Sequence, residues 1–346
     1  MLKVMKALSA ALILCFLSLP VFASGEQEAA ETKGFSIALL DADNSNTWRI
    51  QMEDQMQKVI DSYKADGIVS NYIVFSANGD ANTQVQQLSQ LVSMGVDAVI
   101  INPVSANALN PVIDKAVQRD ILIFAVDSVI AHPDVITITN DQANWARLHA
   151  EWLVKELNGK GNIILFNAIP GVPANDERAA VFSEVLANYP EINVLAEETH
   201  SWSVAEARQK TSQLLAAFSD IDGILTQECT PGIIQAFVEA GRELPAAVNS
   251  GESIEDLRTW EKYGFNSQMV ENPPAVGAHG LMIAVGLLQG KELKDDVMDG
   301  NVIRIKQNLV ISNATRTEWS EKTADAKNSE YIDSLMTVEQ VNELFK

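Results

Sequence analysis

Two polar residues stand at the ends of apolar runs that have the length of a β-strand. Asn102 lies near the end of the run at residues 97–103. Asp127 lies near the end of the next such run, at residues 121–128. In open α/β sheets, ligands bind at the carboxyl ends of the parallel strands, and an acid directly after a buried run requires a polar partner. The spacing therefore predicts that Asn102 and Asp127 face a small polar ligand.

Other reactive residue types form no recognisable catalytic or metal pattern. The four histidines are scattered, without cysteine or histidine partners at metal-ligand spacing. No G-x-S-x-G or similar nucleophile motif occurs. We expect Cys229 to be a small packed residue, with a reactive thiol as the alternative. We predict no metal, no cofactor and no enzymatic activity, and an enzyme that cleaves glycans with paired carboxylates is a distant alternative.

The segments that must position these residues alternate between strands and helices. From residue 35 to residue 270, apolar runs of strand length are separated by stretches in which apolar residues recur with helical spacing. Such alternation indicates parallel sheets with helices on both faces. The number of strand candidates is large for one twisted sheet, which favours two doubly wound α/β domains.

The pattern changes after residue 270. Pro273 and Pro274 prevent a continuing strand or helix. We expect an apolar helix at 275–290, a long extended segment at 302–312, an irregular polar stretch, and a short helix at 338–345. The sequence alone does not assign these last segments to a domain.

The N-terminus has the pattern of an export signal. Two lysines precede an apolar stretch, and a small-residue cleavage pattern ends at Ala23. We predict a signal peptide at residues 1–23, a flexible leader at 24–34, and a periplasmic or cell-surface location. The apolar stretch is short for a membrane span. An uncleaved anchor and lipid attachment at Cys15 are the alternatives.

Composition narrows the choice of partners. The chain has 346 residues, a formal net charge of −21 and 47% hydrophobic residues. That length corresponds to roughly two domains with a sizeable core. The negative charge argues against a nucleic acid or an anionic membrane surface as partner, since both require patches of Lys and Arg.

The order of these segments resembles the type I periplasmic sugar-binding proteins, the ribose/galactose-binding class that serves ABC importers. The stretch 84–128 carries the resemblance most clearly, with a helix, the sequence GVDAVIINP, a second helix and a strand ending in VD. Supporting patterns are G-x-x-A-x-x-x-R at 171–178 and G-x-x-x-Q-E at 223–228. The resemblance implies two domains joined by a three-strand hinge, with the ligand bound between them.

The resemblance also implies discontinuous domains. The first α/β domain would contain residues 35–130 and 272–305. The second would contain residues 131–271 and 306–346. A simple division near residue 130 is what the sequence alone suggests.

The resemblance assigns ligand-binding roles in both domains. Asn46 matches the ligand-binding amide in the loop after the first strand, and Trp48 matches a stacking aromatic. Arg178 and Trp202 match an arginine and an aromatic of the second domain. Structural alternatives are a core position for Trp48, a surface ion pair for Arg178 and a solvent-side loop position for Trp202. The two strand-end residues also match ligand contacts of the family, although Asn-Pro is a common end to a strand.

Five further positions differ from the ribose-binding pattern. Arg49 stands where an aromatic is usual, and Ser128 stands where an arginine is usual. Glu228 and Glu271 replace amides, and Glu252 is the acid nearest to a displaced aspartate. The expected site therefore contains more acceptors than cations, which suits a neutral sugar or polyol, or one with an amine, and disfavours phosphorylated ligands.

These observations predict an exported solute-binding protein that captures a monosaccharide or related polyol. It would deliver this ligand to the membrane permease of an ABC importer, and a chemoreceptor is a second candidate partner. We expect a monomer. The alternative ligands in the same fold are a nucleoside, a furanosyl signal or an amino-acid derivative.

Overall fold

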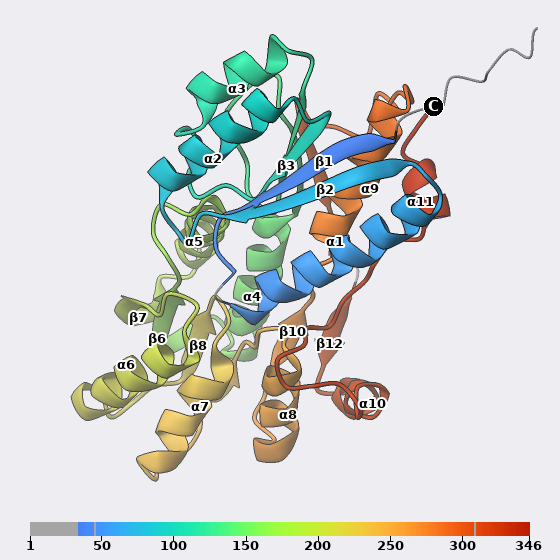
Figure 1. The fold of residues 1–346 in the computed structure, drawn as a ribbon. Helices are drawn as coiled ribbons and strands as arrows, with labels where there is room; N and C mark the ends of the chain where they lie inside the picture. Colours follow the sequence, from blue (N-terminus) through green and yellow to red (C-terminus); the bar gives the residue numbers. More distant parts are fainter. Residues whose placement is uncertain (1–33, 45, 308) are drawn as a thin grey trace, which may run out of the picture. The chain divides into compact units, whose positions relative to one another are not determined.

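The computed structural model describes residues 34–44, 46–307 and 309–346 (Figure 1). The stretch Gly34–Lys346 forms one compact unit. The predicted signal peptide and all but the last residue of the predicted leader lie outside the described residues. Within the described part, no helix combines the length and the apolar character needed to cross a membrane.

A six-stranded parallel sheet is the centre of what we call the first lobe (Figure 1). Its strand order is β11–β5–β4–β3–β1–β2. The strands are β1 (Phe35–Asp41), β2 (Val69–Ser76), β3 (Ala98–Ile101), β4 (Leu122–Val126), β5 (Ile136–Asn140) and β11 (Val302–Ile305). The direction of winding reverses between β1 and β3, and at such a point the carboxyl ends of the strands leave a crevice for a ligand.

Both faces of this sheet are buried. Along β1, Ile37 and Leu39 join the apolar cluster on one face, whereas Ala38 and Leu40 join the cluster on the other. This alternation follows from the two-residue period of a strand, and burial on both faces is characteristic of parallel sheets. The first face is covered by α1 (Thr47–Ala65) and α9 (Val276–Leu288), and the second by α2 (Ala81–Met94) and α3 (Asn110–Val117).

A four-stranded parallel sheet is the centre of the second lobe (Figure 1). Its order is β7–β6–β8–β9, with the strands β6 (Lys160–Asn167), β7 (Glu191–Thr199), β8 (Gly223–Thr226) and β9 (Ala247–Val248). One face carries α4 (Gln142–Glu156) and α5 (Pro173–Leu186). The other carries α6 (Val204–Ala217), α7 (Thr230–Glu239) and α8 (Ile254–Tyr263). The predicted α/β fold with two doubly wound parallel sheets is thus confirmed.

A short antiparallel pair accompanies the second lobe. Strands β10 (Gln268–Val270) and β12 (Val310–Ser312) form this pair, and α10 (Arg316–Lys322) packs against α8. The segment predicted as continuously extended at 302–312 is therefore interrupted, because β11 pairs with β5 in the first lobe and β12 pairs with β10. The stretch predicted to be irregular contains α10.

The chain passes between the lobes in three segments that hydrogen-bond to one another. The side chain of Asn272, two residues beyond the end of β10, accepts from the amide of Asn140 at 2.9 Å and from that of Gln142 at 3.2 Å. The backbone N–H of Asp141 donates to the carbonyl of Ile305 at 2.9 Å. These bonds join the crossings after β5, β10 and β11.

Two stretches pack with the first lobe although the predicted boundaries assign them to the second domain. Strand β5 pairs with β4 and β11, so the chain crosses after Asn140 and not near residue 130. Near the C-terminus, α11 (Val338–Asn342) packs against α9. Val341 and Phe345 enter the first-lobe core there, where Gly286 leaves space for the Phe345 ring. For these stretches the prediction was wrong, and the remaining boundaries stay predictions.

We predict that Gly232→Ala destabilises the second lobe. A Cβ at Gly232, in α7, would lie 2.1 Å from the backbone oxygen of Val204 at the start of α6. A backbone oxygen cannot rotate away, so the two helices must separate, at a cost of about 1–3 kcal/mol. Urea unfolding measures the loss, with Gln213→Ala on the exposed side of α6 as control. Equal stabilities of Gly232→Ala and wild type would contradict this packing.

Candidate functional site

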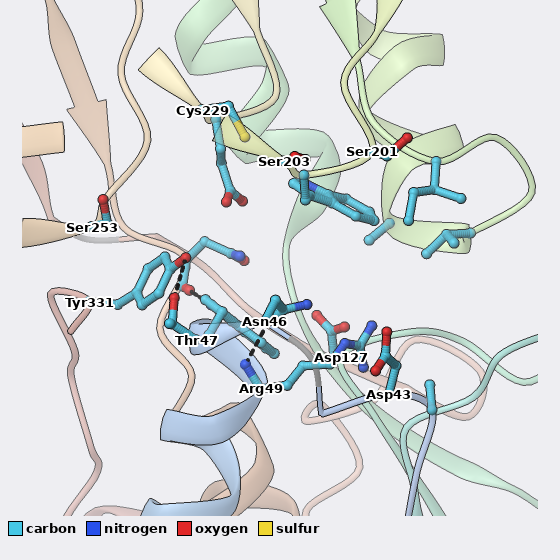
Figure 2. A pocket seen from close by; sticks show the side chains of 18 of the residues that line it. Asp43, Asn46, Thr47, Arg49, Asp127, Ser201, Ser203, Cys229, Ser253 and Tyr331 are labelled. Atoms are coloured by element: carbon cyan, nitrogen blue, oxygen red, sulfur yellow. Dashed lines mark hydrogen bonds between the residues drawn. The ribbon is translucent and has the colours of Figure 1, made fainter. Parts of the chain in front are cut away.

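A cavity of about 850 Å³ lies between the two lobes, at the carboxyl ends of both sheets. Figure 2 shows Asn46, Arg49 and Asp127 on the first-lobe side, and Ser203 and Cys229 across from them. Of the predicted site residues, the cavity lining includes Asn46, Trp48, Arg49, Asp127, Arg178, Trp202 and Glu228. Four others, Asn102, Ser128, Glu252 and Glu271, are buried outside this lining.

The start of α1 brings three first-lobe side chains to the cavity. Asn46 is the N-cap, and its side-chain oxygen accepts from the backbone N–H of Arg49 at 2.9 Å (Figure 2), which satisfies one of the unpaired donors of a helix start. Trp48 is 9% exposed, and its indole N–H donates to the carbonyl of Asn272 at 2.8 Å. Trp48 therefore belongs to the core of the first lobe and also lines the cavity.

Arg49 lies close to a buried carboxylate that is not among the predicted site residues. Its Nη1 is 3.7 Å from Oδ1 of Asp41, the last residue of β1. Burial raises the pKa of Asp41 to about 7, and the positive charge of Arg49 opposes this rise. Burial also raises the pKa of Asp127, and Arg49 opposes that rise as well. One guanidinium thus acts on a carboxylate at the end of β1 and on another directly after β4.

Asp127, which was predicted to contact a ligand, lies in the cavity lining. Asn102 is buried behind it and bonds to its carboxylate. The Asn102 amide donates to Oδ2 of Asp127 at 3.2 Å, and Thr139 Oγ1 donates to the carbonyl of Asp127 at 2.5 Å. Asp127 has a φ of 67°, in the left-handed region that is uncommon for residues other than glycine. Its backbone and its carboxylate are thus both fixed toward the cavity. Ser128 follows Asp127 into the interior.

Arg178 contributes a buried positive charge from α5. It is 1% exposed. Its Nε donates to Oε1 of Gln142 at 2.7 Å, and its Nη1 donates to Oε1 of Glu228 at 3.1 Å. The guanidinium lies 4.0 Å from the centroid of the Trp145 ring, a favourable cation–π distance. The surface ion pair considered as an alternative does not form, since Glu177 pairs with Arg304 instead.

Three carboxyl groups of the second lobe, those of Glu228, Glu252 and Asp256, interact with one another, and Arg178 acts on the first two. Burial raises the pKa of Glu228, while Arg178 lowers it. Burial and the neighbouring Glu228 raise the pKa of Glu252 well above its ordinary value, and neither Glu252 oxygen has a hydrogen-bond partner among the described residues. Asp256 lines the cavity, and burial raises its pKa to about 7. At neutral pH this wall therefore carries less negative charge than its composition suggests.

Trp202 reaches the cavity from the loop between β7 and α6. Its φ is 52°, and its backbone N–H donates to Nδ1 of His200 at 3.1 Å. His200 Nε2 lies 3.1 Å from Thr226 Oγ1, and burial lowers the pKa of His200 to about 4. A neutral imidazole accepts through one nitrogen and donates through the other, so His200 can fix the loop that carries Trp202.

Glu271 lies in the crossing segments and not at the cavity. One of its carboxylate oxygens accepts from the backbone N–H of Leu309 at 3.0 Å, and the other accepts from the hydroxyl of Ser334 at 3.0 Å. The carboxylate thus joins the segments after β10 and β11. The predicted ligand contact of Glu271 would have to compete with these two hydrogen bonds.

Several lining residues are not among those predicted from the sequence, for example Asn272, Asp256 and Tyr331. The position of Asn272 before two prolines signals a break in secondary structure but not a location at the cavity. Asp256 lies in the first turn of α8, where an acid is common as a helix-end feature. Tyr331 lies in a stretch without apolar periodicity. Among the described residues, no group of His, Cys, Asp and Glu side chains is arranged to hold a metal ion.

The lining offers carboxylates, amides, guanidinium groups and aromatic rings from opposite sides of one cavity. Carboxylates and amides can bind hydroxyl groups, often through more than one hydrogen bond. Indole rings cover apolar C–H faces. The arrangement is chemically suited to a small, neutral, hydroxyl-rich molecule.

We predict that Asp41 and Asp256 contribute stability at a pH of about 5 that is lost as the pH rises to about 8. Burial raises the pKa values of Asp41 and Asp256 to about 7, whereas the unfolded chain has the ordinary value of about 3.9. Between these values the folded state binds more protons, so the free energy of unfolding falls with rising pH, by up to about 1.4 kcal/mol per pH unit for each group. Asp256→Asn should reduce this slope.

Urea unfolding at several pH values between about 5 and 8 measures this dependence. Asp66→Asn, at an exposed position at the end of α1, is the control and should keep the wild-type slope. An Asp256→Asn variant with the full wild-type slope would contradict the raised pKa of Asp256.

Known proteins are similar to this chain in sequence and in fold. The family model for the periplasmic binding protein domain matches residues 37–292. A xylitol-binding protein of Mycolicibacterium smegmatis is 33% identical over 226 residues, which is 64% of this chain and 64% of that protein. A galactofuranose-binding protein of Escherichia coli is 25% identical over 251 residues, which is 69% of this chain and 77% of that protein.

A solved structure gives the same result for the fold. The ABC transporter solute-binding protein from Thermobispora bispora superposes with a TM-score of 0.80 at 27% identity. The match covers 89% of this chain and 94% of that one. The predicted resemblance is therefore confirmed, and the chain belongs to the periplasmic binding protein domain family.

Proposed function

We propose that this protein captures a monosaccharide or related polyol in the cavity between its lobes and delivers it to an ABC importer. The observation that carries the proposal is the cavity wall, in which Asp127 of the first lobe faces a second lobe that supplies Arg178 and Trp202. Hydrogen-bonding groups and aromatic rings on opposite sides can enclose a hydroxyl-rich molecule. The xylitol-binding and galactofuranose-binding relatives support the same ligand class.

In this proposal, binding is coupled to a movement of the lobes. Each lobe contributes some of the ligand contacts, so the ligand gains its full set only when both walls approach it. The three crossing segments would absorb that rotation, as hinges do in domain closure. The closed form would then be recognised by the importer's permease.

Location and partners belong to the same proposal. The N-terminal sequence pattern supports export by a signal peptide, and family membership supports a periplasmic or cell-surface site of action. We propose that the protein binds and releases its ligand unchanged. A chemoreceptor is a further candidate partner for the closed form.

We predict that Asp127→Asn weakens sugar or polyol binding. The variant keeps the shape of the side chain but replaces one acceptor oxygen with a donor. A buried ligand hydroxyl that loses its acceptor costs about 1–3 kcal/mol, or about ten- to hundredfold in Kd. Isothermal titration with xylitol, D-ribose, D-galactose and myo-inositol measures the effect, and Asp66→Asn is the matched control.

The same titrations test the proposed function itself. Binding of at least one of these sugars or polyols to the wild-type protein is required. Wild-type protein that binds adenosine, but none of the sugars or polyols, would show that the solute belongs to another class. Unchanged affinity in Asp127→Asn would assign Asp127 a structural role.

We predict that ligand binding changes the fluorescence of Trp202. The ring is half-buried and lines the cavity, so a sugar that covers it would remove water from one face. The change on adding a saturating sugar should be smaller in Trp202→Phe than in wild type. Trp152→Phe, on α4 outside the cavity lining, should keep the full change, and a Trp202→Phe variant with an undiminished change would argue against stacking.

A further inference from the structure

Part of the chain beyond the family match lines the cavity. The match ends at residue 292, but Asn328, Ser329 and Tyr331 belong to the lining. We call residues 328–333 the C-terminal strap. It follows α10 and precedes α11, and it runs beside the crossing segments, where Ser334 bonds to Glu271.

The strap is hydrogen-bonded to the second lobe through its backbone. The N–H of Ile254 donates to the carbonyl of Glu330 at 2.8 Å, and the N–H of Ile332 donates to the carbonyl of Glu252 at 3.0 Å. The N–H of Glu255 donates to the carbonyl of Asn328 at 3.2 Å. These bonds occur at the start of α8, next to the acids of the cavity wall.

The strap is also bonded to the first lobe. The side-chain amide of Gln51, in α1, donates to the carbonyl of Tyr331 at 3.1 Å and accepts from its N–H at 2.8 Å. Asp333 accepts from Gln51 at 3.0 Å and from the backbone N–H of Ala275 at 3.1 Å. The backbone of Tyr331 is therefore fixed from both lobes.

The side chain of Tyr331 closes one end of the cavity. Its hydroxyl accepts from Thr47 Oγ1 at 3.4 Å across that end (Figure 2). A second cavity, of about 390 Å³, also has Thr47, Ser329 and Tyr331 in its lining, so the Thr47–Tyr331 contact separates the two spaces.

The Tyr331 hydroxyl has a donor that a ligand can use. A phenol both donates and accepts, and in the described residues the Thr47 bond occupies its acceptor side. Burial and the nearby Glu228 raise the pKa of Tyr331, so the hydroxyl keeps its proton at neutral pH. The wall next to it, with Ser253 and Asp256, offers further polar groups to the same end of a ligand.

We propose that Tyr331 is a specificity-determining residue, whose hydroxyl donates a hydrogen bond to a ligand oxygen at the strap end of the cavity. The inference rests on the proposed function and adds to it the group that recognises one end of the sugar or polyol. Ligands with an oxygen at that place gain the bond, and ligands that lack it leave the O–H donor of Tyr331 without an acceptor. The strap would thus select among molecules that the rest of the cavity accepts.

The experiment compares wild type, Tyr331→Phe and Tyr189→Phe by isothermal titration with xylitol, D-ribose, D-galactose, myo-inositol, adenosine and cytidine. Tyr331→Phe keeps the ring and removes only the hydroxyl. Kd for the tightest-binding probe should rise about tenfold, as expected for one lost hydrogen bond, and the ratio of Kd values between probes should change. Tyr189 is 38% exposed and outside the cavity lining, so Tyr189→Phe should bind as wild type.

The outcomes separate this inference from the proposed function. If wild type binds nucleosides but no sugar or polyol, the proposed function is wrong, and the ratio between adenosine and cytidine still tests Tyr331. A Tyr331→Phe variant that binds every probe as wild type does, or that weakens all of them equally, would overturn the inference. Equal thermal unfolding midpoints of the variant and wild type would show that the fold is intact.

Discussion

The buried guanidinium of Arg178 is the constraint on which the site depends. A charge removed from water is stable only if hydrogen bonds and opposite charges replace its hydration. Gln142, Glu228 and the ring of Trp145 supply that replacement on three sides of the group. Gln142 in turn donates to Asn272, so the charge of the second lobe is connected to the crossing segments. Any movement of Arg178 therefore disturbs the junction between the lobes.

The same charge explains how so many acids can surround one cavity. Burial raises the pKa of Asp127, Glu228 and Glu252, and the positive charge of Arg178 opposes each rise. Without a cation, carboxylates this deeply buried would bind protons and lose most of their strength as acceptors. Arg178 on one wall and Arg49 near the other limit this rise in pKa and so favour the ionised carboxylates, which are the stronger acceptors. This arrangement leaves little positive charge for an anionic ligand.

Much of the fold could be predicted from the sequence because its cause is local. The alternation of strand and helix patterns depends on residues within one or two helical turns of each other. The burial of both faces of β1 depends on residues only a few positions apart. Asp127 could also be predicted because it follows a recognisable strand, and Arg178 because it ends the G-x-x-A-x-x-x-R pattern at 171–178. The place of β5 could not be predicted in this way, because its pairing with β11 joins residues more than 160 positions apart in the chain. No sequence pattern indicated that Tyr331 lies at the cavity, because its position depends on Gln51 and on the backbone at the start of α8.

The crossing segments and the cavity share residues, and this limits how the two can vary independently. Asn272 lines the cavity, accepts from Asn140 and Gln142, and receives the indole N–H of Trp48 at its carbonyl. A substitution there would change a cavity wall and the junction between the lobes in one step. Glu271 avoids this conflict, because its carboxylate is directed to Leu309 and Ser334 and is outside the cavity lining. Ligand choice can therefore change most freely at positions remote from the junction, such as Trp202, which is fixed by its own loop and His200.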